Sequence, residues 1–405
     1  MSLRIGGMGW VTPLGSGVAQ VWERLRRGEQ PAIQTVSSTI DRRTFQVFGV
    51  PPEATAAAPP HPRLRRSSAI SRYAAVAGLA ALEDAGVQLD PATACRTAVI
   101  FAISNGSVVY TKRFYHEVVE AGAKAASPLL FPETVFNAPA SHLAAILGIT
   151  GASYTLVGDG AVGILAMKMA DDLMLQPSLD RCLVVGSEEA DWLLCDAYRR
   201  WRLLRSAPPL EPFQRPPAGM ILSEGAGAVL LDRSGPVRIE RIDAGGNFRR
   251  QREAAACVAE VFSRLAPGHD DLVVASTNGT FVDEAERAAV LEHCPGATVL
   301  APKAAMGESV GAGAIWQVIC AAQALQSREL PAMTYSVRRG ELQAGTPDNF
   351  ASQRALVSAC GLNQQVAGLT LHLPTPSRRP EVETAAPGAI PGETSPAPDG
   401  ESPSW

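Results

Sequence analysis

The sequence is short of the features that mark membrane, secreted and nucleic-acid-binding proteins. No uninterrupted apolar run in its 405 residues reaches the roughly 20 residues that a membrane-spanning helix needs. The 36 Lys and Arg residues nearly balance the 40 Asp and Glu residues, without a stripe of one sign, so we expect neither a nucleic-acid nor a membrane partner. The first residues, MSLRIGGMGWVTPLGSG, lack a charged segment followed by an apolar core, which argues against a secretion signal.

Cysteine is also sparse. The seven cysteines are odd in number, scattered and free of C-x-x-C spacing, which favours reduced thiols over disulfides or a zinc site. We therefore expect a cytoplasmic protein without a metal. The remaining composition, with 46% hydrophobic and 19% charged residues, is that of an ordinary globular protein with a large core.

Short β-type runs alternate with helical patterns along most of the chain, which predicts an α/β fold with helices covering mainly buried sheets. The predicted strands are 98–104, 153–157, 182–188, 227–232, 271–277, 298–302 and 368–373, and the predicted helices are 71–86, 140–148, 162–175 and 313–327. Residues 51–66 are rich in Pro and Ala and read as an exposed connection. Residues 374–405 hold eight of the 31 prolines and few large apolar side chains, so we expect a disordered tail there.

One glycine-rich loop invites a nucleotide-binding interpretation. The stretch SYTLVGDGAVGILAMK (153–168) spells G-x-G-x-x-G at Gly158, Gly160 and Gly163, between a predicted strand and a predicted helix. A P-loop is excluded because no Lys and Ser or Thr follow the last glycine. A dinucleotide site is disfavoured because the loop does not belong to the first strand–helix unit. The alternative is a tight turn in which the helix start lies close to neighbouring backbone.

The flanking segments favour that alternative and indicate a family. GGMGWVTPLGSG (6–17), YAAVAGLAALEDAG (73–86), FPETVFNAPASHLAAILGITGASYTL (131–156) and EPFQRPPAGMILSEGAGAVLL (211–231), with Glu224 on its acidic position, resemble the β-ketoacyl-acyl-carrier-protein synthases. These condensing enzymes of fatty acid and polyketide assembly have the thiolase fold. The resemblance implies two pseudo-repeated αβαβα halves in five layers, an N-terminal half over 1–235 and a C-terminal half over 236–373, followed by the tail.

The resemblance also assigns the catalytic positions, and this chain departs from the family at three of them. The family's cysteine lies at a strand–helix elbow (158–163), where a helix N-terminus favours a thiolate; here that position is Gly160, which carries no nucleophile. The histidine of the H-G-T motif is replaced by Asn278. The histidine of the K-x-x-x-G-H motif is replaced by Glu308, while Lys303 is retained. We expect these four positions to be inactive in condensation.

The substrate-binding positions are altered too. Thr280 is retained from the segment that holds the pantetheine arm, but the family's second threonine is missing. SACGLNQQVAG (358–368) replaces the glycine-rich gating loop, and Leu362 stands for the gating phenylalanine. Cys360 on this segment is either a displaced thiol or a buried, inert side chain.

Two charged sites remain open to a functional and a structural interpretation. Asp159 is either a base or an acid that satisfies the backbone N–H groups at the helix start. Lys303 and Glu308 form either an acid–base pair or a structural ion pair. The aromatic residues Trp192, Tyr198 and Trp201 have helical spacing and line an acyl tunnel, a subunit contact or an ordinary packed face.

These features predict a non-catalytic ketosynthase-like subunit of the chain-length-factor type. Such a subunit pairs with an active ketosynthase, mainly through the edge strand beside the elbow, and shapes the acyl pocket. Chain-length factors resemble one another in carrying glutamine at the elbow, where this chain has Gly160. The alternatives are an enzyme that uses Glu308, Asn278, Lys303 or Asp159 for acyl transfer, hydrolysis or cyclisation, and a homodimeric thioester-binding scaffold. An acyl carrier protein is the expected partner in each case, and its phosphopantetheine is the substrate arm rather than a resident cofactor.

Overall fold

A computed structural model describes residues 3–338, 340–346 and 350–374, which belong to one compact unit. The tail predicted to be disordered lies, from residue 375 on, outside the described residues, so its disorder stays a prediction. The predicted division at 235 falls between two strands of the same compact unit, and as a domain boundary it also stays a prediction.

The first half of the chain builds a five-stranded mixed sheet. Its strands follow the order β1-β8-β7-β5-β6, with β5 parallel to β6 and β7, and β8 antiparallel to β1 and β7. β5, β7 and β8 are buried because their side chains are apolar on both faces, as in β5, TAVIFAI, whereas β6 at the edge is partly exposed. Their bounds are β1 (Arg4–Thr12), β5 (Thr97–Ile103), β6 (Ser153–Val157), β7 (Arg181–Glu188) and β8 (Gly225–Asp232).

The second half repeats this topology. Its strands follow the order β9-β15-β14-β10-β11, again with parallel pairs at one end and antiparallel pairs at the other. They are β9 (Val237–Asn247), β10 (Leu272–Val274), β11 (Thr298–Leu300), β14 (Arg354–Cys360) and β15 (Gln365–His372). Pairing of β9 with β1 joins the halves, so that thirteen strands of the described chain form one hydrogen-bonded sheet.

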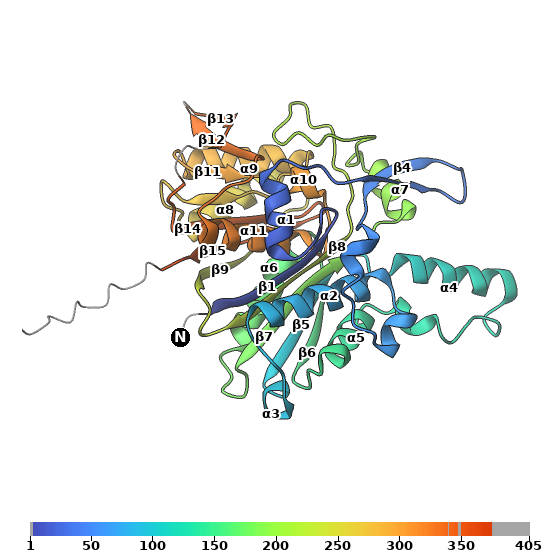
Figure 1. The fold of residues 1–405 in the computed structure, drawn as a ribbon. Helices are drawn as coiled ribbons and strands as arrows, with labels where there is room; N and C mark the ends of the chain where they lie inside the picture. Colours follow the sequence, from blue (N-terminus) through green and yellow to red (C-terminus); the bar gives the residue numbers. More distant parts are fainter. Residues whose placement is uncertain (1–2, 339, 347–349, 375–405) are drawn as a thin grey trace, which may run out of the picture. The chain divides into compact units, whose positions relative to one another are not determined.

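Helices complete five layers. The central layer is α6 (Val162–Leu173) and α11 (Gly313–Ser327), which contact each other and both halves of the sheet (Figure 1). α11 is central because its side chains are buried on nearly every side. α2 (Ala69–Asp84) and α5 (Ala138–Leu147) cover the outer side of the first half, and α8 (Ala254–Leu265) and α9 (Phe281–His293) that of the second. The predicted α/β thiolase-like fold is therefore confirmed.

The remaining helices and strands of the described chain flank these layers or extend their edges. They are β2 (Gly15–Ser16), the β3 (Ile33–Ser37) and β4 (Thr44–Phe48) hairpin, β12 (Thr334–Arg338), β13 (Glu341–Ala344), α1 (Val18–Arg26), α3 (Pro91–Ala94), α4 (Val108–Ala121), α7 (Trp192–Arg200) and α10 (Lys303–Met306). Short 3₁₀ turns lie at 52–55, 62–65, 131–134 and 251–253.

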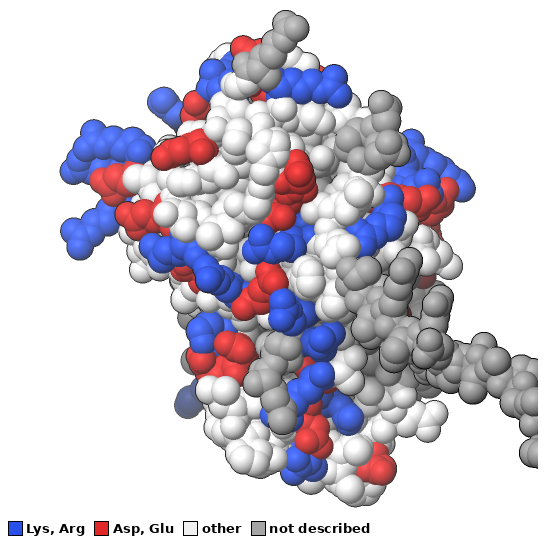
Figure 2. Space-filling model, turned by 90° about the vertical axis from the view of Figure 1, so that its left-hand side faces the viewer, with Lys and Arg blue, Asp and Glu red and all other residues white. Residues whose placement is uncertain are grey.

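Two surface properties match the composition. Within the described residues, no helix combines the length and the apolar character required to cross a bilayer. On the face drawn in Figure 2, basic and acidic side chains alternate and neither sign gathers into one broad patch.

Candidate functional site

The elbow lies between β6 and α6, and Gly160 is buried within it. A Cβ atom added at Gly160 would lie 3.2 Å from the Gly361 Cα and 3.5 Å from the Cys360 carbonyl oxygen. The position therefore lacks an attacking atom, and backbone from the other half of the chain covers it. The third glycine has a separate reason: a Cβ at Gly163 would lie 3.0 Å from side-chain atoms of Ala314 on α11. Glycine there permits the close approach of the two central helices.

Asp159 contacts backbone, but not the backbone that the sequence suggested. One of the two interpretations left open by the sequence has its carboxylate satisfy N–H groups at the start of α6, where the structure shows no side-chain cap. The carboxylate instead accepts hydrogen bonds from the backbone N–H groups of Leu362 (3.1 Å), Asn363 (2.7 Å) and Gln364 (3.2 Å). These partners lie in a turn about two hundred residues away in the sequence.

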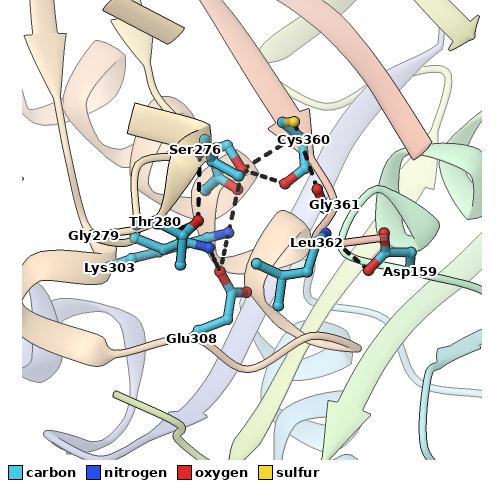
Figure 3. Close-up of polar contacts among 12 residues, drawn as sticks. Asp159, Ser276, Gly279, Thr280, Lys303, Glu308, Cys360, Gly361 and Leu362 are labelled. Atoms are coloured by element: carbon cyan, nitrogen blue, oxygen red, sulfur yellow. Dashed lines mark hydrogen bonds and ion pairs between the residues drawn. The ribbon is translucent and has the colours of Figure 1, made fainter. Parts of the chain in front are cut away.

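That turn belongs to the segment that stands in place of the family's gating loop. Residues 358–368 include the end of β14 and the start of β15, so that only 361–364 form a loop. The hairpin is closed by a hydrogen bond from the Gly361 N–H to the Gln365 carbonyl (2.7 Å). The Gln365 side-chain oxygen accepts from the Asp159 N–H (3.0 Å). Leu362 is buried, and Figure 3 places its side chain between Asp159 and Glu308.

The three remaining catalytic positions meet in one buried network (Figure 3). Lys303 lies at the start of α10, Glu308 two residues beyond its end, and Asn278 between β10 and α9. The Lys303 Nζ and the Asn278 Nδ2 both donate to Glu308 Oε2, at 2.8 and 2.7 Å. The Lys303 and Glu308 side chains are each 2% exposed. The opposite charges are therefore paired away from solvent, and Glu308 engages one of the two N–H donors of the Asn278 amide.

Thr280 also faces inward. Its hydroxyl donates to Asn278 Oδ1 (2.7 Å) and accepts from the Val282 N–H at the start of α9 (3.4 Å). Asp283 fixes the preceding backbone by accepting the N–H groups of Asn278 (2.8 Å) and Gly279 (2.9 Å), and burial raises the pKa of Asp283. These contacts hold Thr280 as a helix cap and partner of Asn278, with a buried side chain.

Ser276 connects this network to the turn. Its hydroxyl accepts from the Cys360 N–H (3.0 Å) and from the Lys303 Nζ (3.3 Å), and it donates to the Cys360 carbonyl (3.2 Å). Cys360 is 1% exposed, and burial raises the pKa of its thiol well above 9. Such a thiol has little thiolate at neutral pH, so the geometry fits the inert interpretation of Cys360.

A pocket of about 640 Å³ opens on the outer side of the turn. Its walls include Asp159, Leu362, Tyr198, Trp201 and Arg249. The rings of Tyr198 and Trp201 pack edge to face, with centroids 5.7 Å apart, so two of the three predicted aromatic residues line a pocket.

The third aromatic residue, Trp192, lies elsewhere, with the Lys112 Nζ 5.2 Å from its ring centroid. Nearby Glu224 accepts hydrogen bonds from the Tyr73 hydroxyl (3.0 Å) and the Val50 N–H (3.1 Å), so the family's acidic position is structural here.

A group of buried carboxylates lies next to the pocket of about 640 Å³ and was not identified from the sequence. Glu188 accepts from the N–H groups of Ser104 (2.9 Å) and Asn105 (3.2 Å), and burial raises its pKa to about 8. Burial likewise raises the pKa of Glu189 to about 7. Two adjacent acids at the end of a buried strand were the available signal in the sequence. Within the described residues, no group of three or more His, Cys, Asp or Glu side chains is arranged to hold a metal ion.

Comparisons with known proteins agree with this architecture. The family profile described as "Beta-ketoacyl synthase, N-terminal domain" matches residues 2–235. Nodulation protein E of Rhizobium leguminosarum bv. trifolii is 25% identical over 356 residues, which cover 81% of this chain and 87% of that protein. The 3-oxoacyl-[acyl-carrier-protein] synthase 2 of Vibrio cholerae is 23% identical over 236 residues, 56% of each chain.

Solved structures share the fold. The ishigamide ketosynthase/chain length factor superposes with a TM-score of 0.79 at 18% identity, covering 92% of this chain and 99% of that one. A ketosynthase in complex with its chain length factor from Xenorhabdus doucetiae gives a TM-score of 0.75 at 19% identity, covering 92% and 98%.

Proposed function

Because the chain belongs to the β-ketoacyl synthase family, we propose that it is a cytoplasmic, non-condensing subunit that pairs with a catalytic ketosynthase and shapes the acyl pocket in polyketide or fatty acid biosynthesis. One observation carries this proposal: the elbow that would hold a nucleophile holds Gly160, covered by the Gly361 backbone. Condensation through an acyl-enzyme requires a side chain that attacks the thioester, and glycine has none.

The chemistry of the other positions supports the same conclusion. Stabilising the enolate that decarboxylation releases requires donors aimed at a developing negative charge. Here the Asn278 Nδ2 donates to Glu308, and Glu308 itself carries a carboxylate that repels an enolate. A repurposed acid–base site is disfavoured because Lys303 and Glu308 are paired and shielded from solvent. A substrate would have to displace that ion pair before either group could transfer a proton.

The edge of the sheet supports the pairing. Among the described strands, β6 ends the sheet, and its Tyr154 and Val157 side chains are 42% and 53% exposed. Other exposed apolar side chains lie on α4 and on the segment that follows it, including Val119, Leu129 and Phe131. An edge strand that exposes apolar side chains is typical of a subunit interface. The Xenorhabdus doucetiae structure is a ketosynthase in complex with its chain length factor, which makes a partner of the same fold the natural occupant.

Co-expression with a cysteine-bearing ketosynthase from the neighbouring genes tests the pairing. We expect a stoichiometric complex that survives size-exclusion chromatography and is lost when Tyr154 and Val157 are both changed to Asp. Ile40→Asp is the matched control, because Ile40 is 84% exposed on the β3–β4 hairpin, away from β6. If the chain instead forms a homodimer that does not bind the co-expressed ketosynthase, the result would refute heterodimer formation and favour the scaffold alternative.

Incubation of the isolated chain with acyl-carrier thioesters tests the absence of chemistry. We expect neither a covalent acyl adduct nor a condensed product by mass spectrometry. Turnover that Glu308→Gln abolishes would establish the repurposed enzyme instead.

A further inference from the structure

The turn 361–364 is held against the elbow more firmly than a hairpin requires. A tight hairpin needs its own cross-strand hydrogen bond, which the Gly361 N–H to Gln365 carbonyl contact supplies. Three further hydrogen bonds join the turn to Asp159, because three backbone N–H groups donate to its carboxylate, and a fourth runs from the Asp159 N–H to the side chain of Gln365 at the start of β15. Hydrogen bonds to an ionised acceptor are stronger than those between neutral groups.

The fit between the two segments leaves no room for a side chain at the contact. A Cβ atom at Gly361 would lie 2.1 Å from Asp159 Oδ2, so glycine is required for the carboxylate to pack on the turn. The same residue covers the elbow, since its Cα would lie 3.2 Å from a Cβ at Gly160. The contact that engages Asp159 therefore also closes the space into which a side chain at Gly160 would project.

We propose that Asp159 is a latch that keeps the turn 361–364 closed over position 160 of the elbow. Position 160 then lacks a nucleophile and is also covered by backbone. This proposal rests on the proposed non-condensing function and adds that access to position 160 is controlled. Position 160 becomes accessible only when the hydrogen bonds between Asp159 and the turn open. The pocket of about 640 Å³ then ends at this closed turn, because Asp159 and residues 362–365 form part of its wall. An acyl thioester in that pocket meets the turn and the first elbow residues, Gly158 and Asp159, while Gly160 lies behind the turn and is not part of the pocket wall.

The test compares two variants with an introduced thiol at the elbow: Gly160→Cys alone, and Gly160→Cys with Asp159→Asn. Native proteins are treated with iodoacetamide, and modification at position 160 is followed by peptide mass spectrometry. We expect slow modification of the single variant and a rate about tenfold higher in the double variant, the factor for losing one charge-assisted hydrogen bond of the closed state. Equal rates in the two variants would overturn the latch.

A second measurement needs no change at Gly160. In Asp159→Asn, hydrogen exchange of the Leu362, Asn363 and Gln364 amides should accelerate about tenfold, because the carboxamide has lost the charge and one acceptor oxygen, and its NH2 group then faces a backbone N–H donor. Asp232→Asn is the matched control: Asp232 accepts the Ser234 and Gly235 N–H groups in a turn after β8, and its loss should leave residues 362–364 unchanged. Unchanged exchange in Asp159→Asn would refute the latch even where the thiol variants fail to fold. Neither result depends on complex formation, so a failed latch and a failed pairing are distinguishable.

Discussion

The buried Lys303–Glu308 pair gives a quantitative test of how the vacated site is held together. Removing one partner with Lys303→Met leaves the Glu308 carboxylate with the Asn278 amide as its donor, in a side chain 2% exposed. Breaking a buried pair in this way costs about 3–5 kcal/mol, because a desolvated charge is left without its counterion. With about 2.1 cal/mol/K of unfolding entropy per residue, a loss of about 4 kcal/mol lowers the Tm of a 374-residue unit by about 5 °C.

The assay is a double-mutant cycle of Lys303→Met, Glu308→Gln and both together, followed by thermal and urea unfolding. Since the double variant removes both charges, it should be more stable than the sum of the single effects allows, by about 2–3 kcal/mol. Arg215→Met is the control: the Arg215–Glu284 pair is more than half exposed on both sides, and its loss should cost less than about 1 kcal/mol. Additive effects at Lys303 and Glu308, within about 0.5 kcal/mol, would refute a coupled buried pair.

Two further predictions follow from the buried titratable groups. Burial raises the pKa of Glu188 from its usual 4.5 to about 8, so the folded state binds the extra proton between those values and loses stability as pH rises through about 8. Urea unfolding of Glu188→Gln should therefore vary less with pH between 5 and 8 than that of the wild type, and parallel profiles would contradict the assignment. In the native protein, iodoacetamide should modify the exposed Cys95 and spare Cys360, whose buried thiol has a pKa well above 9. If Cys360 were modified as fast as Cys95, the result would instead support the interpretation of Cys360 as a displaced nucleophilic thiol.

Local patterns in the sequence predicted several elements closely. The strand at 153–157 and the helix at 313–327 match β6 and α11 residue for residue. A β-type run that ends at a glycine marks the strand, and an apolar run that starts at a glycine marks the helix. β9 was not predicted. Its sequence, VRIERIDAGGN, mixes charges and glycines, and its middle is half-exposed, so it becomes a strand through pairing with β15 and β1.

The candidate site was also predicted from the sequence only in part. Motif order placed Gly160, Asn278, Lys303 and Glu308 at corresponding positions, and the structure brings the last three into hydrogen-bonding contact. The role of Asp159 was not predictable from its neighbours, because its partners at 362–364 are more than two hundred residues away. A carboxylate at a helix start suggests a local partner among the first N–H groups of that helix. The Asp159 carboxylate instead accepts its hydrogen bonds from a turn that is distant in the sequence, which local patterns do not reveal.

The position of β6 has a mechanical consequence. Since β6 is one of the two edge strands of the described sheet and the Gly160 elbow follows it directly, a second chain that adds its own strand there would extend one continuous hydrogen-bonded sheet across both proteins. Asp159 is the second residue beyond the end of β6, so a shift that a docked strand imposed on β6 would reach its carboxylate through Gly158 alone. A partner at this edge would therefore act directly on the contact that holds the turn 361–364 over position 160.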